Sequence, residues 1–234
     1  SKKKFTFSAT NTKKTTLKTF GKKKFLSFKF KDNFYDKKLI KILSKANYIL
    51  ISIPPQKKRD LVLKNFSKFL KKLKFKKLIY ISATSVYGNH NGKWVNENSK
   101  LKGNTKFGLG RKIVEKSWIK FRDLYKLDIN ILRVSGIYSK ESNVLKKISK
   151  KSIYVKEKKY FSRIRIEDLA QIIKKMFYSQ QSFLILNASD DKPATNIEVA
   201  NFAAKLLKIK NLRPMPLSNF NNKMIKEFYK DSKK

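Results

Sequence analysis

The chain has 234 residues, with 58 Lys and Arg against 16 Asp and Glu, and a formal net charge of +42. Its hydrophobic content of 41% suffices for a folded core, while the lack of cysteine excludes disulfides and thiolate metal sites, and a single histidine, His90, excludes a histidine-based zinc cluster. No apolar run approaches the roughly 20 residues of a membrane span, and the Lys-rich N-terminus has no adjoining apolar region of the signal-peptide kind. We therefore expect a cytoplasmic protein with no metal site and no membrane span.

The basic charge by itself would suggest a nucleic-acid partner. However, only seven of the basic residues are Arg, and the lysines are spread along the whole chain. Dedicated nucleic-acid readers favour Arg because its guanidinium makes bidentate contacts. We therefore predict no dedicated nucleic-acid site and attribute the charge to a general drift toward Lys. A nonspecific nucleic-acid-binding basic protein remains an alternative, and binding to RNA at low salt is expected on physical grounds.

Strands and helices alternate over the first 134 residues. The run 47–53 is almost continuously apolar, as in strands buried on both faces of a parallel sheet, and Pro54 and Pro55 end it. Such alternation predicts a parallel sheet covered by helices on both faces, which is an α/β fold. The predicted strands are 5–9, 24–30, 47–53, 77–82 and 129–134, and the predicted helices are 36–46, about 57–73 and about 108–125.

The last third has a different pattern. Residues 163–170 lead into a helix with Leu169, Ile173 and Met176 on one side, and a strand is predicted at 183–187. Thr195 and Glu198 have the spacing of a capping box at the start of another helix. We therefore divide the chain into a Rossmann-type region, a small C-terminal lobe and a basic tail, at 1–140, 141–222 and 223–234.

Five stretches in order resemble the extended short-chain dehydrogenase/reductase superfamily, in particular its NAD-dependent epimerase/dehydratase branch. They are Ser-Ile-Pro-Pro at 52–55, Ser-Ala-Thr-Ser-Val-Tyr-Gly at 82–88, Leu-Arg-Val-Ser-Gly-Ile-Tyr at 132–138, Arg-Ile-Arg-Ile-Glu-Asp-Leu-Ala at 163–170 and Asn-Ala-Ser-Asp-Asp-Lys-Pro-Ala-Thr-Asn at 187–196. The resemblance implies a doubly wound Rossmann-type sheet with a small substrate lobe, and NADP or NAD as cofactor. It also implies a small substrate such as a sugar nucleotide, and a homodimer formed through the helices at 57–73 and 108–125.

Such proteins begin with a strand and a G-x-x-G-x-x-G turn, whose glycines let the cofactor pyrophosphate approach a helix N-terminus. The chain has no such turn, and Phe5–Ala9 matches the second strand of the family. We expect that the first strand and helix are missing from the sequence. The alternative is a protein that lacks them, with a central sheet position left open.

The resemblance places the cofactor-binding residues at the ends of the first predicted strands. The family binds ribose hydroxyls with an acidic residue after its second strand, whereas basic and hydroxyl groups accept a 2′-phosphate. Thr10, Asn11 and Lys13 stand there without a carboxylate, which favours NADP, although abundant lysine alone would also give this pattern. The remaining predicted cofactor-binding residues are Ile53, Pro54, Pro55, Ser82 and Arg111.

The catalytic positions of the family are occupied by other residue types. The resemblance places Ala83 at the Ser/Thr, Phe107 at the tyrosine and Arg111 at the lysine of the usual acid/base set. Alanine and phenylalanine have no titratable group, and Arg does not titrate. Either the chain is a catalytically silent binder, or the chemistry has moved to neighbours, or the register is wrong, although no tyrosine lies between Tyr87 and Tyr125. The neighbouring candidates are Ser82, Thr84, Ser85, Tyr87 and Lys112, with Tyr87 the strongest and Ser85 and Thr84 beside it.

Three further residues are predicted to contact the substrate. Trp94 lies on the loop that lines the cleft in relatives, although it could equally seal that loop against the sheet. Arg133 and Tyr138 follow or end a strand, where open α/β sheets bind ligands, although Arg133 could instead satisfy nearby carbonyls. We interpret His90 as a loop residue and Asp168 as a helix-terminus carboxylate that pairs with an arginine.

Overall fold

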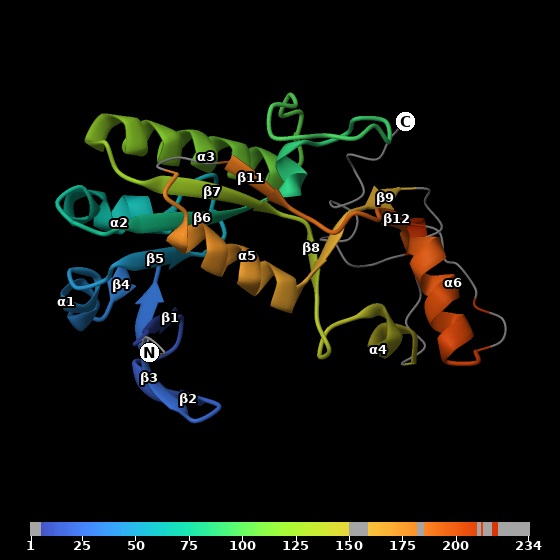
Figure 1. The fold of residues 1–234 in the computed structure, drawn as a ribbon, viewed down its shortest axis with the longest axis horizontal. Coiled ribbons are helices and arrows are strands. Elements are labelled where there is room, and N and C mark those ends of the chain that lie inside the picture. Colours follow the sequence, from blue (N-terminus) through green and yellow to red (C-terminus); the bar gives the residue numbers. More distant parts are fainter. Residues whose placement is uncertain (1–5, 150–158, 182–184, 210–211, 213–216, 220–234) are drawn as a thin grey trace.

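A computed structural model describes residues 6–149, 159–181, 185–209, 212 and 217–219. Its centre is a parallel sheet with the strand order β11-β7-β6-β5, made of Ile185–Ala188, Ile129–Val134, Lys77–Ala83 and Tyr48–Ile51. Helices α2 (Leu61–Leu70) and α3 (Lys106–Tyr125) pack on one face, and α5 (Ile166–Tyr178) packs on the other (Figure 1). This arrangement confirms the predicted Rossmann-type α/β fold.

The N-terminal residues form a second sheet. It has the order β1-β3-β2, with β4 also paired to β3, and consists of Ala9–Asn11, Lys23–Lys31, Thr16–Phe20 and Phe34–Tyr35. The predicted strand at 5–9 is wrong, because pairing with β3 begins only at Ala9 and residues 6–8 are not strand, while Phe5 lies outside the described residues. The β2–β3 hairpin was not predicted, because β2 is solvent-exposed along its length and carries no buried apolar run.

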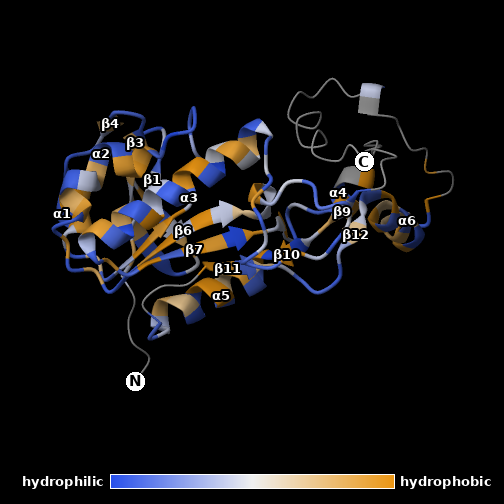
Figure 2. Cartoon of the chain, turned by 90° about the horizontal axis from the view of Figure 1, so that it is seen from above, coloured by the Kyte–Doolittle hydropathy of each residue, from blue (hydrophilic) through white to orange (hydrophobic). Residues whose placement is uncertain are grey.

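The two sheets share one hydrophobic core without pairing to each other in the described residues. Phe28 and Phe30 of β3 are buried in the same cluster as Ile49 and Ile51 of β5, and Phe66 of α2 belongs to it as well. Figure 2 shows hydrophobic residues on the strands and along one side of the helices that cover them. Packing therefore holds β3 and β5 in one core, although no described strand joins β1 to β5.

Several observed bounds differ from the predicted ones. The helix α1 spans Lys38–Leu43 and the strand β5 stops two residues before Ile53, so both are shorter than predicted. By contrast, β3 and α3 are longer than predicted. Pro54 and Pro55 lie beyond β5 and cannot extend it, because proline has no N–H for the sheet ladder. The 3₁₀ turn η1 (Thr84–Val86) follows β6 directly.

The C-terminal elements form a smaller cluster beside the main sheet. They comprise the strands β8 (Gly136–Tyr138), β9 (Tyr160–Phe161), β10 (Arg163–Arg165) and β12 (Ala194–Thr195), the helices α4 (Val144–Ser149) and α6 (Asn196–Leu206), and the turn η2 (Leu217–Asn219). The capping box of Thr195 and Glu198 is confirmed at the start of α6. Ile148, Ala200 and Ala203 form a local core, which is consistent with a small lobe, while the predicted boundaries stay predictions. The tail 223–234 lies outside the described residues.

A buried lysine fixes α5 to the base of the sheet. Lys77, at the start of β6, is 2% exposed, and its Nζ donates to the carbonyls of Ser179 and Gln181 at 2.6 and 2.9 Å. Asp128 lies 3.6 Å from the same ammonium, and burial raises the pKa of that carboxyl. The end of α5 is thereby fixed to β6 through charge-assisted hydrogen bonds.

Replacing this lysine should destabilise the fold. In Lys77→Met the two carbonyls after α5 lose their donor, and we expect the free energy of unfolding in urea to fall by about 2–3 kcal/mol. The adjacent Lys76 is exposed, so Lys76→Met serves as a matched control that removes the same charge with little effect. Equal loss in the two variants would show that the Lys77 contacts do not stabilise the protein.

Candidate functional site

The candidate site forms where β6 and β7 end and α3 begins. After β6 the chain turns through η1, and Gly88 takes a φ of +68°, a conformation that favours glycine. The start of α3 lies against this turn, because a Cβ at Gly108 would come within 2.5 Å of the Ser85 carbonyl oxygen. A glycine at this position lets the helix approach the turn closely.

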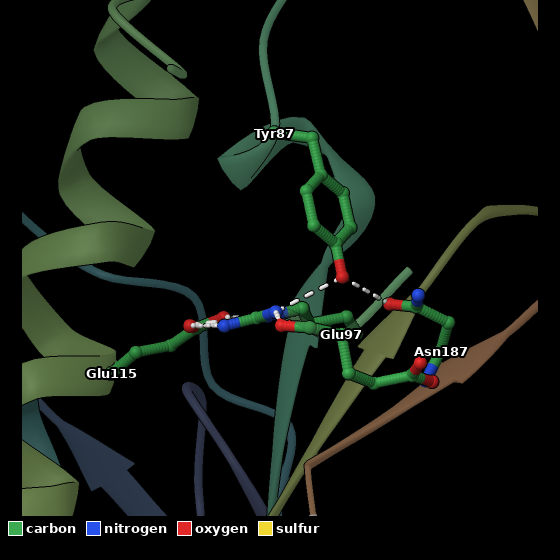
Figure 3. Close-up of polar contacts among 5 residues, drawn as sticks. Tyr87, Glu97, Glu115 and Asn187 are labelled. Carbon is green, nitrogen blue, oxygen red and sulfur yellow. Dashed lines mark hydrogen bonds and ion pairs between the residues drawn. The ribbon is translucent and has the colours of Figure 1, made fainter. Parts of the chain in front are cut away.

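A buried arginine connects the elements of the site. Arg133, in β7, is 3% exposed and donates from Nη2 to Glu115 Oε2 at 2.9 Å, with Nε 3.2 Å from the same oxygen (Figure 3). Its Nη1 donates to the Tyr87 hydroxyl at 2.9 Å and to the Glu97 carbonyl at 3.1 Å. One guanidinium therefore ties α3, the turn after β6 and the following loop to the end of β7.

The Tyr87 hydroxyl makes two hydrogen bonds, one as acceptor and one as donor. The hydroxyl accepts from Arg133 and donates to Asn187 Oδ1 at 2.7 Å (Figure 3), and the ring centroid lies 5.1 Å from the guanidinium carbon. The side chain is 3% exposed. In this structure the phenol is part of a hydrogen-bonded network, and its predicted catalytic role stays a prediction.

Glu97 clamps the loop that follows the turn. Its carbonyl accepts from Arg133, and its carboxylate Oε1 accepts from the backbone N–H of Asn187 in β11 at 2.7 Å. The loop is thus fixed to the ends of β7 and β11 at once. The alternative that Arg133 satisfies carbonyls is correct for Glu97, but its main partner is the Glu115 carboxylate.

The ion pair is almost fully removed from water. The side chains of Arg133 and Glu115 are 4% and 2% exposed. Burial alone would lower the pKa of Arg133, but the hydrogen bonds and charge of Glu115 raise it above its ordinary value. The guanidinium therefore stays charged, and each member of the pair depends on the other to offset its desolvation.

Breaking this pair from one side should cost more than removing it whole. We expect Arg133→Met to lower the free energy of unfolding by about 3–5 kcal/mol, because Glu115 is left buried and unpaired. The double variant Arg133→Met/Glu115→Leu should lose less than Arg133→Met alone in urea unfolding. Arg165→Met, which breaks the exposed pair with Glu167, is the control and should change little. Additive losses in the double variant would contradict the coupling.

The residues predicted to occupy the standard catalytic positions surround the same turn. Ala83 ends β6, Phe107 lies in the first turn of α3 and is 45% exposed, and Arg111 donates from Nη1 to the Ile81 carbonyl at 3.0 Å. Among the other candidates, Ser82 is buried and its hydroxyl has no hydrogen-bond partner within the described structure. Thr84 and Ser85 belong to η1 and are partly exposed, as is Lys112 on α3.

Of the predicted cofactor residues in the N-terminal sheet, Lys13 lines a basic hollow, whereas Thr10 and Asn11 do not. Thr10 and Asn11 lie inside β1, and Asn11 Oδ1 accepts from the backbone N–H groups of Lys13 and Lys14, so its side chain shapes the loop. This loop borders a pocket of about 620 Å³ at the carboxyl ends of β1 and β3, lined by Lys13, Lys14, Thr15, Lys29, Asn33, Phe34, Tyr35, Asp36 and Lys37. Ile53, Pro54 and Pro55 follow β5, with Pro55 facing Gly110 of α3.

The predicted substrate residues do not share one environment. Arg133 is buried, whereas Tyr138 in β8 is 37% exposed and Trp94 is 78% exposed. The alternative that Trp94 seals its loop against the sheet is therefore wrong. His90 Nε2 lies 3.0 Å from the Lys100 carbonyl, as expected of a loop residue, while Asp168 lies in the first turn of α5, where Arg165 pairs with Glu167 instead.

Sequence reasoning missed the acceptors of the network. Asn187 and Glu97 come from positions far from Arg133 in the chain, and no local pattern marks them. Glu115 carried a signal, because it sits beside Val114 and before Trp118 on the buried side of α3. A carboxylate at such a position predicts a buried cationic partner.

The described residues contain neither a metal cluster nor a membrane-spanning helix. No group of three or more His, Asp or Glu side chains in this part of the chain could hold a metal ion. None of the described helices is both long and apolar enough to cross a membrane.

Solved structures with the same architecture cover most of the chain. One is a functionally unknown conserved protein from Silicibacter pomeroyi DSS, 28% identical over 78% of this chain and 66% of that chain, with a TM-score of 0.71. A UDP-N-acetylglucosamine 4-epimerase from Bacillus cereus is 14% identical over 92% of this chain and 79% of its own, with a TM-score of 0.68. The chain has the fold of the NAD-dependent epimerases and dehydratases.

A third solved structure is similar in fold over most of the chain. The dTDP-glucose 4,6-dehydratase from Bacillus anthracis, solved in complex with NAD, is 15% identical over 87% of this chain and 73% of its own, with a TM-score of 0.67. No protein-family model matches the chain, and no curated protein matches it. The chain spans just under two-thirds of the length of the Silicibacter protein. At these identities the likeness concerns the fold.

Proposed function

We propose that the protein is an NAD(P)-dependent oxidoreductase or epimerase-like protein of the extended short-chain dehydrogenase class, with nonstandard catalytic residues. Its substrate would be a small polar molecule such as a sugar nucleotide. Support comes from the epimerase and dehydratase fold and from the NAD and sugar-nucleotide complexes of similar structures. The observation that carries the cofactor assignment is the lysine-lined pocket beside β1 and β3.

The pocket fits the phosphate of NADP. Lys13, Lys14, Lys29 and Lys37 border it together with the hydroxyl-bearing Thr15. Asp36 is the carboxylate of this lining, and its pKa is lowered because the Thr15 hydroxyl and the backbone N–H of Lys38 donate to it. Four ammonium groups around one carboxylate favour an anion, and a 2′-phosphate distinguishes NADP from NAD.

The nicotinamide of the cofactor would accept or donate a hydride. In this proposal Arg111 supplies a fixed positive charge beside the ribose, and Ser82, Ile53 and Pro54 contribute to the wall of the cofactor site. Proton transfer would fall to Tyr87, Ser85 or Thr84, since Ala83 and Phe107 have no group that can titrate.

A catalytically silent dinucleotide-binding sensor or partner protein is the second candidate. It is favoured by the Tyr87 hydroxyl, which already accepts from Arg133 and donates to Asn187. A phenol used in this way would have to give up a hydrogen bond to act on a substrate. The same cofactor pocket serves both candidates.

Cofactor selectivity tests the pocket. We expect Lys13→Ala/Lys14→Ala to weaken NADPH binding at least tenfold, which is about 1.4 kcal/mol, and to leave NADH binding unchanged in a fluorescence titration. The loop should keep its shape, because Asn11 binds the backbone rather than the side chains of both residues. Lys68→Ala/Lys72→Ala removes equal charge from exposed positions on and just beyond α2 and is the control. Parallel losses for NADH and NADPH would contradict a 2′-phosphate site.

Turnover separates the two candidates. The absorbance of bound NADPH is followed after candidate carbonyl substrates are added to the wild type and to Tyr87→Phe. Hydride transfer in the wild type that is lost in the variant would support the enzyme, and tight cofactor binding without transfer would support the silent binder. Absence of cofactor binding would contradict both.

A homodimer and a cytoplasmic location complete the proposal. The outer side of α3 carries a shallow hollow lined by Lys116, Ile119, Lys120, Asp123 and Leu124, and Leu124 is 64% exposed. Exposed apolar side chains such as Leu124 on a long helix are typical of a pairing surface. We expect light scattering to give the mass of a dimer and Ile119→Glu/Leu124→Glu to give that of a monomer. An unchanged mass would exclude α3 as the interface.

A further inference from the structure

The β2–β3 hairpin extends from the N-terminal sheet as an arm, defined here as residues 16–26. β2 is the outer strand of its sheet, pairing only with β3 among the described strands, and its residues 17–20 are exposed. Figure 1 shows the hairpin projecting at the bottom of the view. Both faces of its distal half therefore meet solvent.

One face of the arm alternates lysine with phenylalanine. The antiparallel register places Lys18 opposite Phe25 and Phe20 opposite Lys23, and residues two apart on a strand share a face. Phe7 extends this face, since its ring centroid lies 4.5 Å from that of Phe25. Phe20 is 78% exposed and Phe7 is 44% exposed. Such exposure is unusual for phenylalanine, which is usually buried.

The charge around these rings has one sign. Residues 6–31 contain eight lysines, all exposed, and no Asp or Glu. The nearest carboxylates described, Asp32 and Asp36, lie toward the pocket end of β3 rather than at the tip of the hairpin. A polyanion is the complementary partner.

We propose that the lysine and phenylalanine face of the arm binds single-stranded nucleic acid without sequence preference. Unstacked bases would stack on the rings of Phe20 and Phe7, and phosphates would pair with the ammonium groups of Lys18 and Lys23. Phosphate contacts carry no sequence information and stacking tolerates any base, which accounts for the lack of sequence preference.

The arrangement favours a single strand over a duplex or a membrane. The bases of a duplex are already stacked on one another and cannot lie on protein rings. Phe20 lies at the distal end of the arm, but Lys22, Lys23 and Lys24 surround it there, so a bilayer would meet these charged groups together with the ring. Burial of these ammonium groups in hydrocarbon would cost more than the exposed rings gain.

The arm is separate from the proposed cofactor pocket. Lys23 begins β3, whereas Lys29, near the other end of the strand, lines the pocket. Six residues of extended strand span about 20 Å. Binding at the arm and binding of NADPH can therefore be measured and lost independently.

The test uses a fluorescein-labelled oligouridylate of about 12 nucleotides and fluorescence anisotropy at about 50 and about 200 mM salt. We expect Phe20→Ala to weaken binding about tenfold at both salt concentrations, because a stacking contact is lost and no charge changes. Lys18→Ala/Lys23→Ala should weaken binding and reduce the slope of log affinity against log salt by about 1.4, as expected for two phosphate contacts. NADPH binding should be unchanged in both variants.

Lys68→Ala/Lys72→Ala is the matched control and should change the salt slope by less than half as much. Equal effects of the two lysine pairs, with no effect of Phe20→Ala, would overturn the proposal and show that net charge alone binds the RNA. Vesicles with anionic headgroups that bind the protein while the oligouridylate does not would also overturn it, and would show a membrane-binding arm.

Discussion

The ion pair of Arg133 and Glu115 is the interaction on which the site depends. It lies where β7, α3 and the turn after β6 meet, and both side chains are almost completely buried. Two charges removed from water are tolerated only because they face each other and because the remaining guanidinium N–H groups find Tyr87 and Glu97. The position of the turn, the loop and the helix therefore follows from one electrostatic requirement.

This requirement bears on the chemistry of the fold. The network uses the Tyr87 hydroxyl as both acceptor and donor. Near it, Ala83 and Phe107 carry no titratable group, and Arg111 donates to the Ile81 carbonyl. The chain thus has the fold of the epimerases and dehydratases, and the proposal of nonstandard catalytic residues rests on the residue types around Tyr87.

The main sheet could be predicted from sequence because most residues of its central strands are apolar and consecutive. Ile129–Val134 is buried at every position, and the capping box at Thr195 is a local pattern. The β2–β3 hairpin escaped prediction because its stability comes from pairing rather than from burial. Asn187 and Glu97 escaped because they join the site only in the folded chain, where Asn187 meets Tyr87 and Glu97 meets Arg133, each from a distant position in sequence. The sequence therefore predicts the strands of the main sheet, whereas the hydrogen-bond partners around Arg133 depend on the tertiary fold.

The most direct measurement is nuclear magnetic resonance of the Nε–H groups in protein labelled with ¹⁵N-arginine. The chain has seven arginines, and the Arg133 signal can be assigned by its loss in Arg133→Lys. A buried guanidinium bound to Glu115 should give an Nε–H that exchanges with water far more slowly than that of Arg165, whose side chain is 58% exposed. Exchange of Arg133 as fast as that of Arg165 would show that the ion pair is open to water and would contradict the account.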